Sequence, residues 1–278
     1  MARLDRLGFM HAAPRLLLGI LGSLACMVAN AVSVDAQMLD RGSDIAYRRA
    51  LGPAADARQL NANVAATARA RRIANRLVGS ASASEAEAKQ LHWAVNVIPG
   101  AAPDVRVYPG GRVIVHESLL TATGLADQEI GAILAHAFAH LLLGHDARRI
   151  EIPERVETAD PNRAELAIAD TTADALRRIR YTAAEVAAAD HASVEMLARA
   201  AYDPRAAGSA WRRLAVGGKG IVERVPVGEE RLLALDAASR AAVPLFEETR
   251  AKAEAYERAQ RTRPPARITG PSGGPPIR

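Results

Sequence analysis

The stretch that decides the fold is Ile133-Leu-Ala-His-Ala-Phe-Ala-His-Leu-Leu-Leu-Gly-His145. Its apolar residues belong to a predicted helix from about Gln128 to Leu143, capped at its start by Asp127. His136 and His140 are four residues apart, so both imidazoles project from one face of this helix. The spacing therefore predicts that the two histidines can share one metal ion.

One position departs from the zinc-binding H-E-x-x-H motif. In that motif the glutamate after the first histidine takes a proton from the metal-bound water, whose pKa the metal has lowered. The residue at this position is Ala137, which has no group that accepts a proton. The sequence leaves two alternatives open: a hydrolase with a rearranged site, or a hydrolase fold that no longer hydrolyses.

The N-terminal residues have the layout of a secretory signal peptide. Three arginines precede an apolar run over residues 16–28, and the small-residue site Val34-Asp-Ala36 follows. We expect cleavage after Ala36 and export to the periplasm of a bacterium, with an uncleaved membrane anchor as the alternative. The only cysteine, Cys26, lies in the apolar run. The mature chain is therefore predicted to contain no disulfide.

The composition distinguishes a folded domain, residues 37–260, from a C-terminal tail, residues 261–278. Residues 37–260 are long enough for one buried core, and abundant alanine and leucine with few aromatic residues predict mostly helices. Residues 261–278 are rich in proline, glycine and arginine and are predicted to be disordered. The 36 basic and 31 acidic residues form no clustered basic stripe. This pattern argues against a nucleic-acid partner, and membrane contact is expected only through an uncleaved anchor.

Hydrophobic periodicity predicts an α+β fold that is predominantly helical, with a small β-sheet packed on a helical bundle. Strands are expected at His92–Ile98, Val105–Tyr108 and Arg112–His116, the last two joined by a tight turn at residues 109–111. Helices are expected at Asn61–Val78, Arg163–Arg178, Thr182–Ala200, Pro204–Leu214, Glu229–Ala242 and Leu245–Gln260, in addition to the two-histidine helix.

Three segments occur in a familiar order: Trp93-Ala-Val-Asn-Val-Ile98, then Tyr108-Pro-Gly-Gly-Arg-Val-Ile-Val115, then Asp127-Gln-Glu-Ile-Gly-Ala-Ile-Leu-Ala-His136. With them the chain resembles the gluzincin metallopeptidases of the HtpX and CAAX-prenyl-protease type, particularly their exported bacterial, BepA-like relatives. The resemblance covers about Asn61 to Thr249. It implies a zincin-like fold, zinc as the cofactor and polypeptides as the substrates.

The resemblance also implies where the other site residues lie. The family's third zinc ligand is taken as the glutamate of an E-A-D segment, which corresponds to Ala188-Ala-Asp190. Ala188 then occupies the ligand position, and Asp190 keeps the carboxylate that orients a ligating histidine. A T-H-P segment supplies a transition-state histidine in the family. Its position here is Val225, and the arginine that follows it is Arg231.

Three side chains are candidates to complete the metal site. His191 lies three residues after Ala188 on the same predicted helix, about 4.5 Å along its axis, and helical side chains lean towards the N-terminus. It would form a three-histidine zinc site with the first two histidines, unless it is simply a polar surface residue. Glu185 would lean away from the site, and His145 is expected to be a helix-end residue. Without a third ligand, zinc binding is predicted to be weakened or absent.

We expect the histidine pair at the floor of a groove beside the strand after the turn. An extended polypeptide can add to such a strand by backbone hydrogen bonds that need no metal. The residues predicted to line this groove are Arg112, Val113, Ile114, Val115 and His116. The first hypothesis is a pseudopeptidase that binds polypeptides or envelope protein partners in quality control. The alternative is a functioning zinc metalloendopeptidase.

Overall fold

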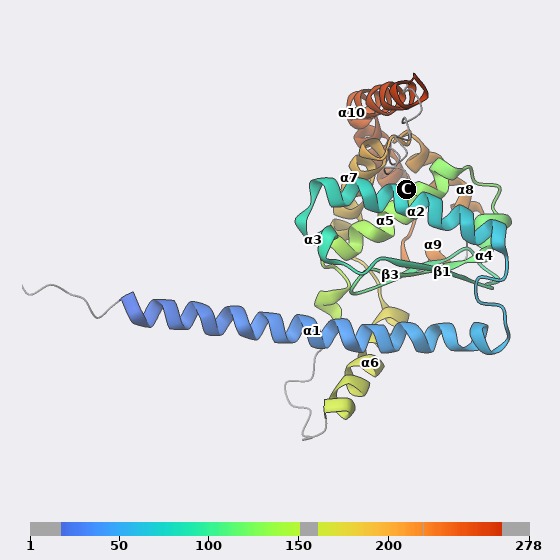
Figure 1. Cartoon of the computed structure of the whole chain (residues 1–278). Helices are drawn as coiled ribbons and strands as arrows, with labels where there is room; N and C mark the ends of the chain where they lie inside the picture. The colour runs from blue at the N-terminus through green and yellow to red at the C-terminus, as the bar shows by residue number, and fades with distance from the viewer. Residues whose placement is uncertain (1–17, 151–160, 219, 263–278) are drawn as a thin grey trace, which may run out of the picture.

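The computed structural model describes residues 18–150, 161–218 and 220–262, with side chains from residue 37 onward (Figure 1). The predicted tail after residue 262 and the first 17 residues of the predicted signal peptide lie outside the described residues. The prediction of a mainly helical α+β fold is confirmed.

The sheet has three strands, β1 (Ala94–Ile98), β2 (Val105–Tyr108) and β3 (Arg112–His116). Their spatial order is β1-β3-β2, with β3 parallel to β1 and antiparallel to β2. The predicted hairpin between β2 and β3 is therefore confirmed. Its turn contains Gly110 and Gly111 at φ of +91° and +93°, a region that glycine enters without steric cost.

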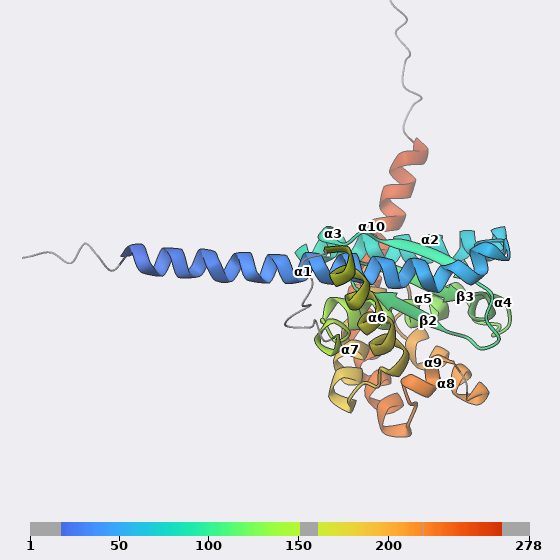
Figure 2. The ribbon, with the colours of Figure 1, turned by 90° about the horizontal axis from the view of Figure 1, so that it is seen from below.

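The sheet is covered by helices on both faces (Figures 1 and 2). The long helix α1 (Leu18–Asp56) crosses one face, with α6 (Pro161–Arg178) packed against it, and α2 (Val64–Ser84) and α5 (Asp127–Leu142) cover the other. Side chains alternate accordingly along β3. Val113 and Val115 lie in the main core, whereas Ile114 joins a second cluster with residues of α1 and α6.

The remaining helices form a bundle around α5. The larger ones are α7 (Ala183–Arg199), α8 (Ala206–Gly217) and α10 (Glu229–Thr262), and the end of α10 projects from the body (Figures 1 and 2). The short ones are α3 (Ala86–Gln90), α4 (Glu117–Thr121), α9 (Ile221–Arg224) and the 3-10 helix η1 (Ala147–Arg149). The bundle surrounds α5 so closely that 11 of its 16 residues are buried.

Two helix predictions require correction. Two helices were expected on either side of Pro244, but α10 continues through it. Ala242 and Phe246 flank the proline and are buried in the main core, so packing outweighs the hydrogen bond that a proline removes. Asp127 was expected to cap α5, but the cap is Ala126, whose N–H donates to the Glu129 carboxylate at 2.8 Å.

Helix α1 was not predicted beyond the apolar run. It continues without a break from Leu18 to Asp56, across the expected cleavage point at Ala36. Its contacts with the sheet begin just after this point, because Asp40 and Asp44 each lie 2.7 Å from the Arg112 guanidinium. None of the helices in the described part of the chain is both long and apolar enough to cross a membrane.

Candidate active site

The two histidines of α5 point at each other. His136 and His140 are 1% and 2% exposed, and their Nε2 atoms are 3.1 Å apart. Two nitrogens that bind one tetrahedral zinc ion at about 2.0–2.1 Å are roughly 3.3 Å apart. The structure thus brings together the pair that the sequence identified, in a geometry that one metal ion can share.

His136 is held in place by charged and aromatic neighbours. Its Nδ1 lies 2.9 Å from Asp190 Oδ1, and Asp190 in turn accepts two hydrogen bonds from Arg231 at 2.8 and 2.9 Å. The Trp211 ring contacts His136 edge-on at 5.0 Å, and the Arg231 guanidinium lies 4.2 Å above that ring. Asp190 and Arg231 therefore occupy the positions that the resemblance implied, and they orient His136.

The pKa values of these groups follow from burial and charge. Burial lowers the pKa of His136, and the nearby Arg231 lowers it further against the opposing effect of Asp190. For Asp190, burial opposes ionisation, but hydrogen bonds from Arg231 and His136 hold its pKa below the ordinary value. Burial and the neighbouring histidines lower the pKa of His140 to about 2. Both histidines are therefore neutral at physiological pH, the form that binds metal.

A third histidine stands behind the pair. His145 Nδ1 lies 2.8 Å from His140 Nδ1, because the chain turns back at Gly144, whose φ is +66°. The Asp190 carboxylate favours a proton on Nδ1 of His136, which leaves Nε2 of that ring to accept from His140. His140 Nδ1 then accepts from His145. His145 is thus a buried partner of His140, and its ring does not lie between the two Nε2 atoms.

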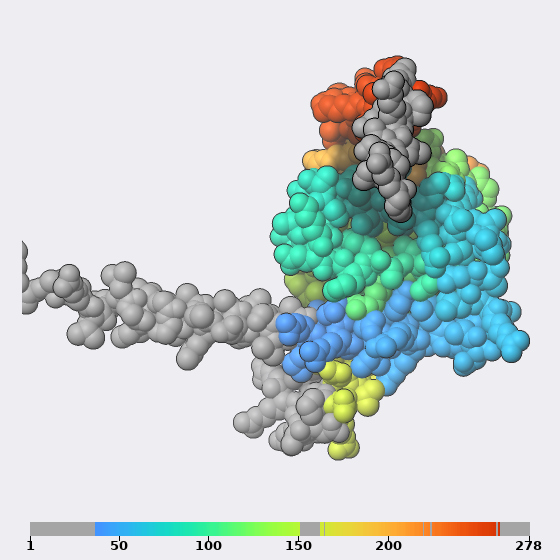
Figure 3. Space-filling view, in the orientation of Figure 1, coloured from blue at the N-terminus to red at the C-terminus, as the bar shows by residue number. Residues whose placement is uncertain are grey.

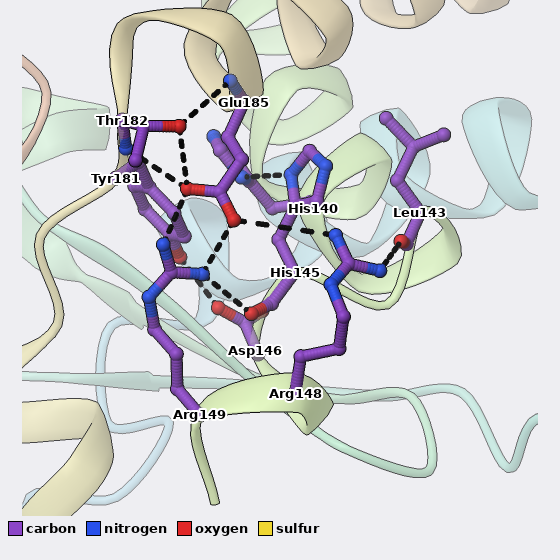
Figure 4. Close-up of polar contacts among 9 residues, drawn as sticks. All are labelled: His140, Leu143, His145, Asp146, Arg148, Arg149, Tyr181, Thr182 and Glu185. Atoms are coloured by element: carbon purple, nitrogen blue, oxygen red, sulfur yellow. Dashed lines mark hydrogen bonds and ion pairs between the residues drawn. The ribbon is translucent and has the colours of Figure 1, made fainter.

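Tyr181 covers the other face of His140. Their ring centroids are 3.6 Å apart in a stacked arrangement, and the Tyr181 hydroxyl donates to Asp146 at 2.6 Å (Figure 4). Asp146 is 2% exposed, and burial raises its pKa to about 6 despite the bond from Tyr181. The sequence did not identify either residue. Nothing in its pattern separates Asp146 from other acidic residues, and the stacking depends on the tertiary fold.

Glu185 is committed to other partners. Its carboxylate pairs with Arg149, lies 4.0 Å from Arg148 and accepts from the Thr182 N–H at 2.9 Å, as Figure 4 shows. The hydrogen bond from Arg149 lowers the pKa of Glu185 to about 2, and burial opposes the shift. Glu185 caps α7 and anchors the segment after α5. It does not reach the histidine pair, as the sequence predicted.

A small cavity of about 30 Å³ lies against the histidine pair, which is room for about one water molecule. Ala137 and Val225 both line it, together with His136 and His140. These two side chains therefore lie where the predicted general base and transition-state histidine would be needed. Neither carries a group that accepts or donates a proton.

The structure corrects the predicted position of the third ligand. Ala188 is exposed, because a residue two positions before Asp190 lies about 200° round the helix from it. The residue one turn before Asp190, on the same face, is Val186, which is buried in the main core at 6% exposure. On α7, the residue that shares the face of Asp190 one turn earlier is therefore Val186, and Ala188 does not. The side chain at this position is again aliphatic.

His191 does not join the pair. Its side chain is 71% exposed and lies 3.5 Å from Glu195, one turn along α7. In the ranges that the structure describes, no three His, Cys, Asp or Glu side chains converge to hold a metal ion. The residues described here thus supply two of the three protein ligands that a catalytic zinc site uses. As they stand, they do not match the donor set of a resident catalytic zinc.

Comparison with known families agrees with this scaffold. The model of Peptidase family M48 matches residues 65–239, which is more than half of the chain. The chain belongs to peptidase family M48. The match includes the histidine helix, Asp190 and Arg231, so the M48 domain contains every site residue discussed above. M48 is a family of zinc metallopeptidases.

Two curated relatives carry the same printed name, mitochondrial metalloendopeptidase OMA1. The protein of Schizosaccharomyces pombe is 26% identical over 190 residues, which cover 66% of this chain and 54% of that protein. The protein of Saccharomyces cerevisiae is 27% identical over 137 residues, which cover 45% and 38%. The M48 chain described here thus spans about half the length, or less, of these relatives.

The predicted substrate groove of the M48 domain also requires correction. Strand β3 is hydrogen-bonded on both sides, so Arg112–His116 cannot accept another strand. Arg112 instead holds α1 through Asp40 and Asp44, and His116 Nδ1 lies 3.1 Å from the Ala102 carbonyl. The edge strand beside the histidines is β2, whose residues 105–107 line the small cavity.

Proposed function

We propose that this M48 domain is a pseudopeptidase that binds polypeptides without hydrolysing them. One observation carries the proposal: aliphatic side chains, Ala137 and Val225, line the cavity at the histidine pair, and Val186 is the residue one turn before Asp190 on α7. The residues around them retain the charged contacts that orient His136. The scaffold of a metallopeptidase is thus present without its proton-transfer groups.

The expected chemical consequence is large. Removing a general base alone typically costs ~10²–10⁴ in rate, and a zinc ion bound by two histidines lacks the third protein ligand of catalytic sites. The residues present contact one another and hold the two histidines in place. His140 bonds to its two neighbouring histidines, Tyr181 stacks on it, and Asp190 orients His136.

A larger cavity beside the histidines supports the binding half of the proposal. It has a volume of about 520 Å³ and lies between α7 and α10, in the range of cavities that receive ligands. Small and apolar side chains form most of its wall, with Asp190, Arg231, Glu230 and His191 as its polar groups. An apolar side chain of an extended polypeptide suits this composition.

We extend the proposal to the cellular setting. The arginines and apolar run before residue 36 favour export to a bacterial periplasm, and the segment order favours the HtpX, CAAX-protease and BepA-like branch of M48. A role in envelope quality control would follow from polypeptide binding in that compartment. Localising a tagged full-length chain in cell fractions tests this part separately, and recovery in the cytoplasm would contradict it.

The alternative is a working zinc metalloendopeptidase. Family membership and the printed name of the two relatives favour it. It requires a ligand that reaches the histidine pair from elsewhere, because His191 is directed towards Glu195. Measured zinc and proteolysis separate the two functions.

The first experiment is elemental analysis of the purified chain beside a His136→Ala/His140→Ala control, with cleavage of unfolded β-casein assayed with and without chelator. We expect much less than one zinc per chain and no chelator-sensitive cleavage. About one zinc, lost in the control and accompanied by cleavage, would establish the alternative function and overturn the proposal.

A reconstruction tests the assignment of positions. Ala137→Glu with Val186→Glu should restore about one zinc per chain, because the carboxylate introduced at position 186 would project from the face of α7 that carries Asp190. The matched control is Ala137→Glu with Ala188→Glu, in which the second carboxylate projects into solvent. Equal zinc in the two double variants would show that Val186 is not the ligand position.

A second pair of variants tests polypeptide binding. Ala187 lines the 520 Å³ cavity and the adjacent Ala188 does not, although both are exposed on α7. Ala187→Phe should weaken the binding of fluorescent β-casein at least tenfold, and Ala188→Phe should change it by less than twofold. Absence of binding to the unmodified chain, or equal effects of both variants, would contradict a binding site in this cavity.

A further inference from the structure

The cavity at the histidine pair is bounded on one side by the end of α6 and the residues that join it to α7. Leu176, Ile179 and Tyr181 form one wall, and Val105 and Val107 of the edge strand β2 form another. In the antiparallel register with β3, residues 105 and 107 direct their backbone groups away from that strand, and on this side the Val105 carbonyl accepts from Arg224 at 3.0 Å. The segment 176–181 therefore lies where an added polypeptide strand would meet β2.

Tyr181 separates the two cavities beside the site. Among the described residues, it is the one that lines both the 30 Å³ cavity at the histidines and the 520 Å³ cavity between α7 and α10. Its ring is fixed on one side by stacking on His140 and at its tip by the bond to Asp146. Displacing this ring would join the cavities into one groove that runs from the edge of β2 to α10.

The position of this segment depends on helix α1. Leu176 lies in the cluster that α1 and α6 share, with Ala46, Tyr47 and Leu51 of α1, and it also lines the cavity at the histidines. Leu176 thus belongs both to the apolar cluster of α1 and α6 and to the wall of the cavity at the histidines. Figure 3 shows α1, in blue, lying along the body against α6, in yellow.

The two helices approach closely at Gly42. A Cβ atom built at this position would lie 2.3 Å from the Ile168 Cγ2 atom and 3.2 Å from the Ala169 backbone nitrogen on α6. It would also lie 2.8 Å from the Ile168 Cβ atom, which no rotation of that side chain moves, so a change of rotamer cannot relieve the contacts. Any larger residue at 42 must therefore push α6 away from α1. At Gly52, on the same helix, an added Cβ meets nothing within 4 Å.

From this arrangement we infer that α1 is a clamp on the groove: it holds α6, and through Leu176 it keeps Tyr181 closed over His140. Releasing α1 from α6 opens the groove to an extended polypeptide with an apolar side chain. The occupant rests on the proposed function, whereas the clamp itself does not. A displaced N-terminal helix would thereby control access to the site from a distance.

The experiment measures access to the buried histidines without any polypeptide. Diethyl pyrocarbonate modifies accessible imidazoles, and mass spectrometry gives the rate at each histidine, with the exposed His191 as an internal standard. We compare Gly42→Val with the matched control Gly52→Val in the full chain. Gly42→Val should raise the rates at His136 and His140 at least tenfold relative to His191, and Gly52→Val by less than twofold.

A second variant distinguishes exposure of the site from unfolding of the whole chain. Tyr181→Ala removes the ring that covers His140 and leaves the contact of α1 with α6 intact. It should raise the rate of modification at His140 to a similar extent. Equal rates for Gly42→Val and Gly52→Val would overturn the clamp. An increase in Gly42→Val that appears equally at His145, together with a lower midpoint of urea unfolding, would also overturn the clamp. Such a pattern would indicate global unfolding.

The same variants separate the clamp from the proposed function. Binding of fluorescent β-casein should be at least tenfold tighter in Gly42→Val than in Gly52→Val. Raised histidine reactivity without casein binding in either chain would support the clamp and contradict the polypeptide-binding function. Casein binding that is equal in both chains, with no change in reactivity, would support the function and overturn the clamp.

Discussion

The two sides of the histidine pair differ in what they retain. Behind His136, the contacts of Asp190, Arg231 and Trp211 form a network of charged and aromatic side chains. In front of the pair, Ala137 and Val225 line a cavity with no proton-transfer group of their own. We expect the first side to stabilise the fold and the second to matter only for a reaction.

Free energy explains why the two sides need not change together. Removing one partner from a buried ion pair leaves an unpaired charge and costs stability. Replacing a group that faces a cavity by a small aliphatic side chain leaves no such charge. A metallopeptidase scaffold can therefore outlast its chemistry.

Breaking the network behind His136 should have the largest effect. Arg231→Met would leave the Asp190 carboxylate buried without its guanidinium, at an expected cost of about 3–5 kcal/mol in the free energy of unfolding. Urea denaturation measures it. The control on the same helix is Lys252→Met, whose exposed pair with Glu248 should contribute less than about 0.5 kcal/mol. A loss below about 1 kcal/mol for Arg231→Met would contradict the expectation that the contacts behind His136 stabilise the fold.

Lowering the pH should have the second largest effect on the free energy of unfolding, through the two buried histidines. Their pKa is lower in the folded chain than in the unfolded chain, so the unfolded state binds more protons below about pH 6.5. Stability should fall by about 1 kcal/mol per pH unit and per histidine as the pH drops from 6.5 to 5. The measurement is best made in Asp146→Asn, because Asp146 titrates in this range with the opposite sign. A flat profile would contradict neutral buried histidines.

Asp146 should change the free energy of unfolding with the opposite dependence on pH. Its pKa of about 6 in the folded chain lies above the ordinary value, so folding disfavours the ionised form and this penalty is fully present above pH 6. Asp146→Asn should raise the free energy of unfolding by about 1–3 kcal/mol at pH 7.5. The gain should largely disappear by pH 4. An equal gain at both pH values would show that ionisation is not its cause.

The smallest effect is expected at His191. Because this side chain is 71% exposed, His191→Ala should change the free energy of unfolding by less than about 0.5 kcal/mol. It should also leave the zinc content of the Ala137→Glu/Val186→Glu variant unchanged. A drop in zinc would return His191 to the metal site and revive the three-histidine arrangement.

Sequence spacing was sufficient where the physical cause is local. The hairpin of β2 and β3 follows from Pro109-Gly-Gly111, since the turn needs two residues at positive φ. The convergence of His136 and His140 follows from helical geometry. Motif correspondence placed the third ligand at Ala188, whereas the helical period puts Val186, one turn before Asp190, on the face of Asp190 and Ala188 on the opposite face.

A mainly helical metallopeptidase scaffold, the histidine pair and the alanine at position 137 could be read from the sequence alone, because turn chemistry and helical periodicity act over a few residues. The fold was needed to show which strand lies at the sheet edge beside the histidines, how Tyr181 and Asp146 lie around His140, and that Leu176 joins the apolar cluster of α1 and α6. These features join residues separated by tens of positions or more. They arise from packing between elements, which local sequence patterns do not encode.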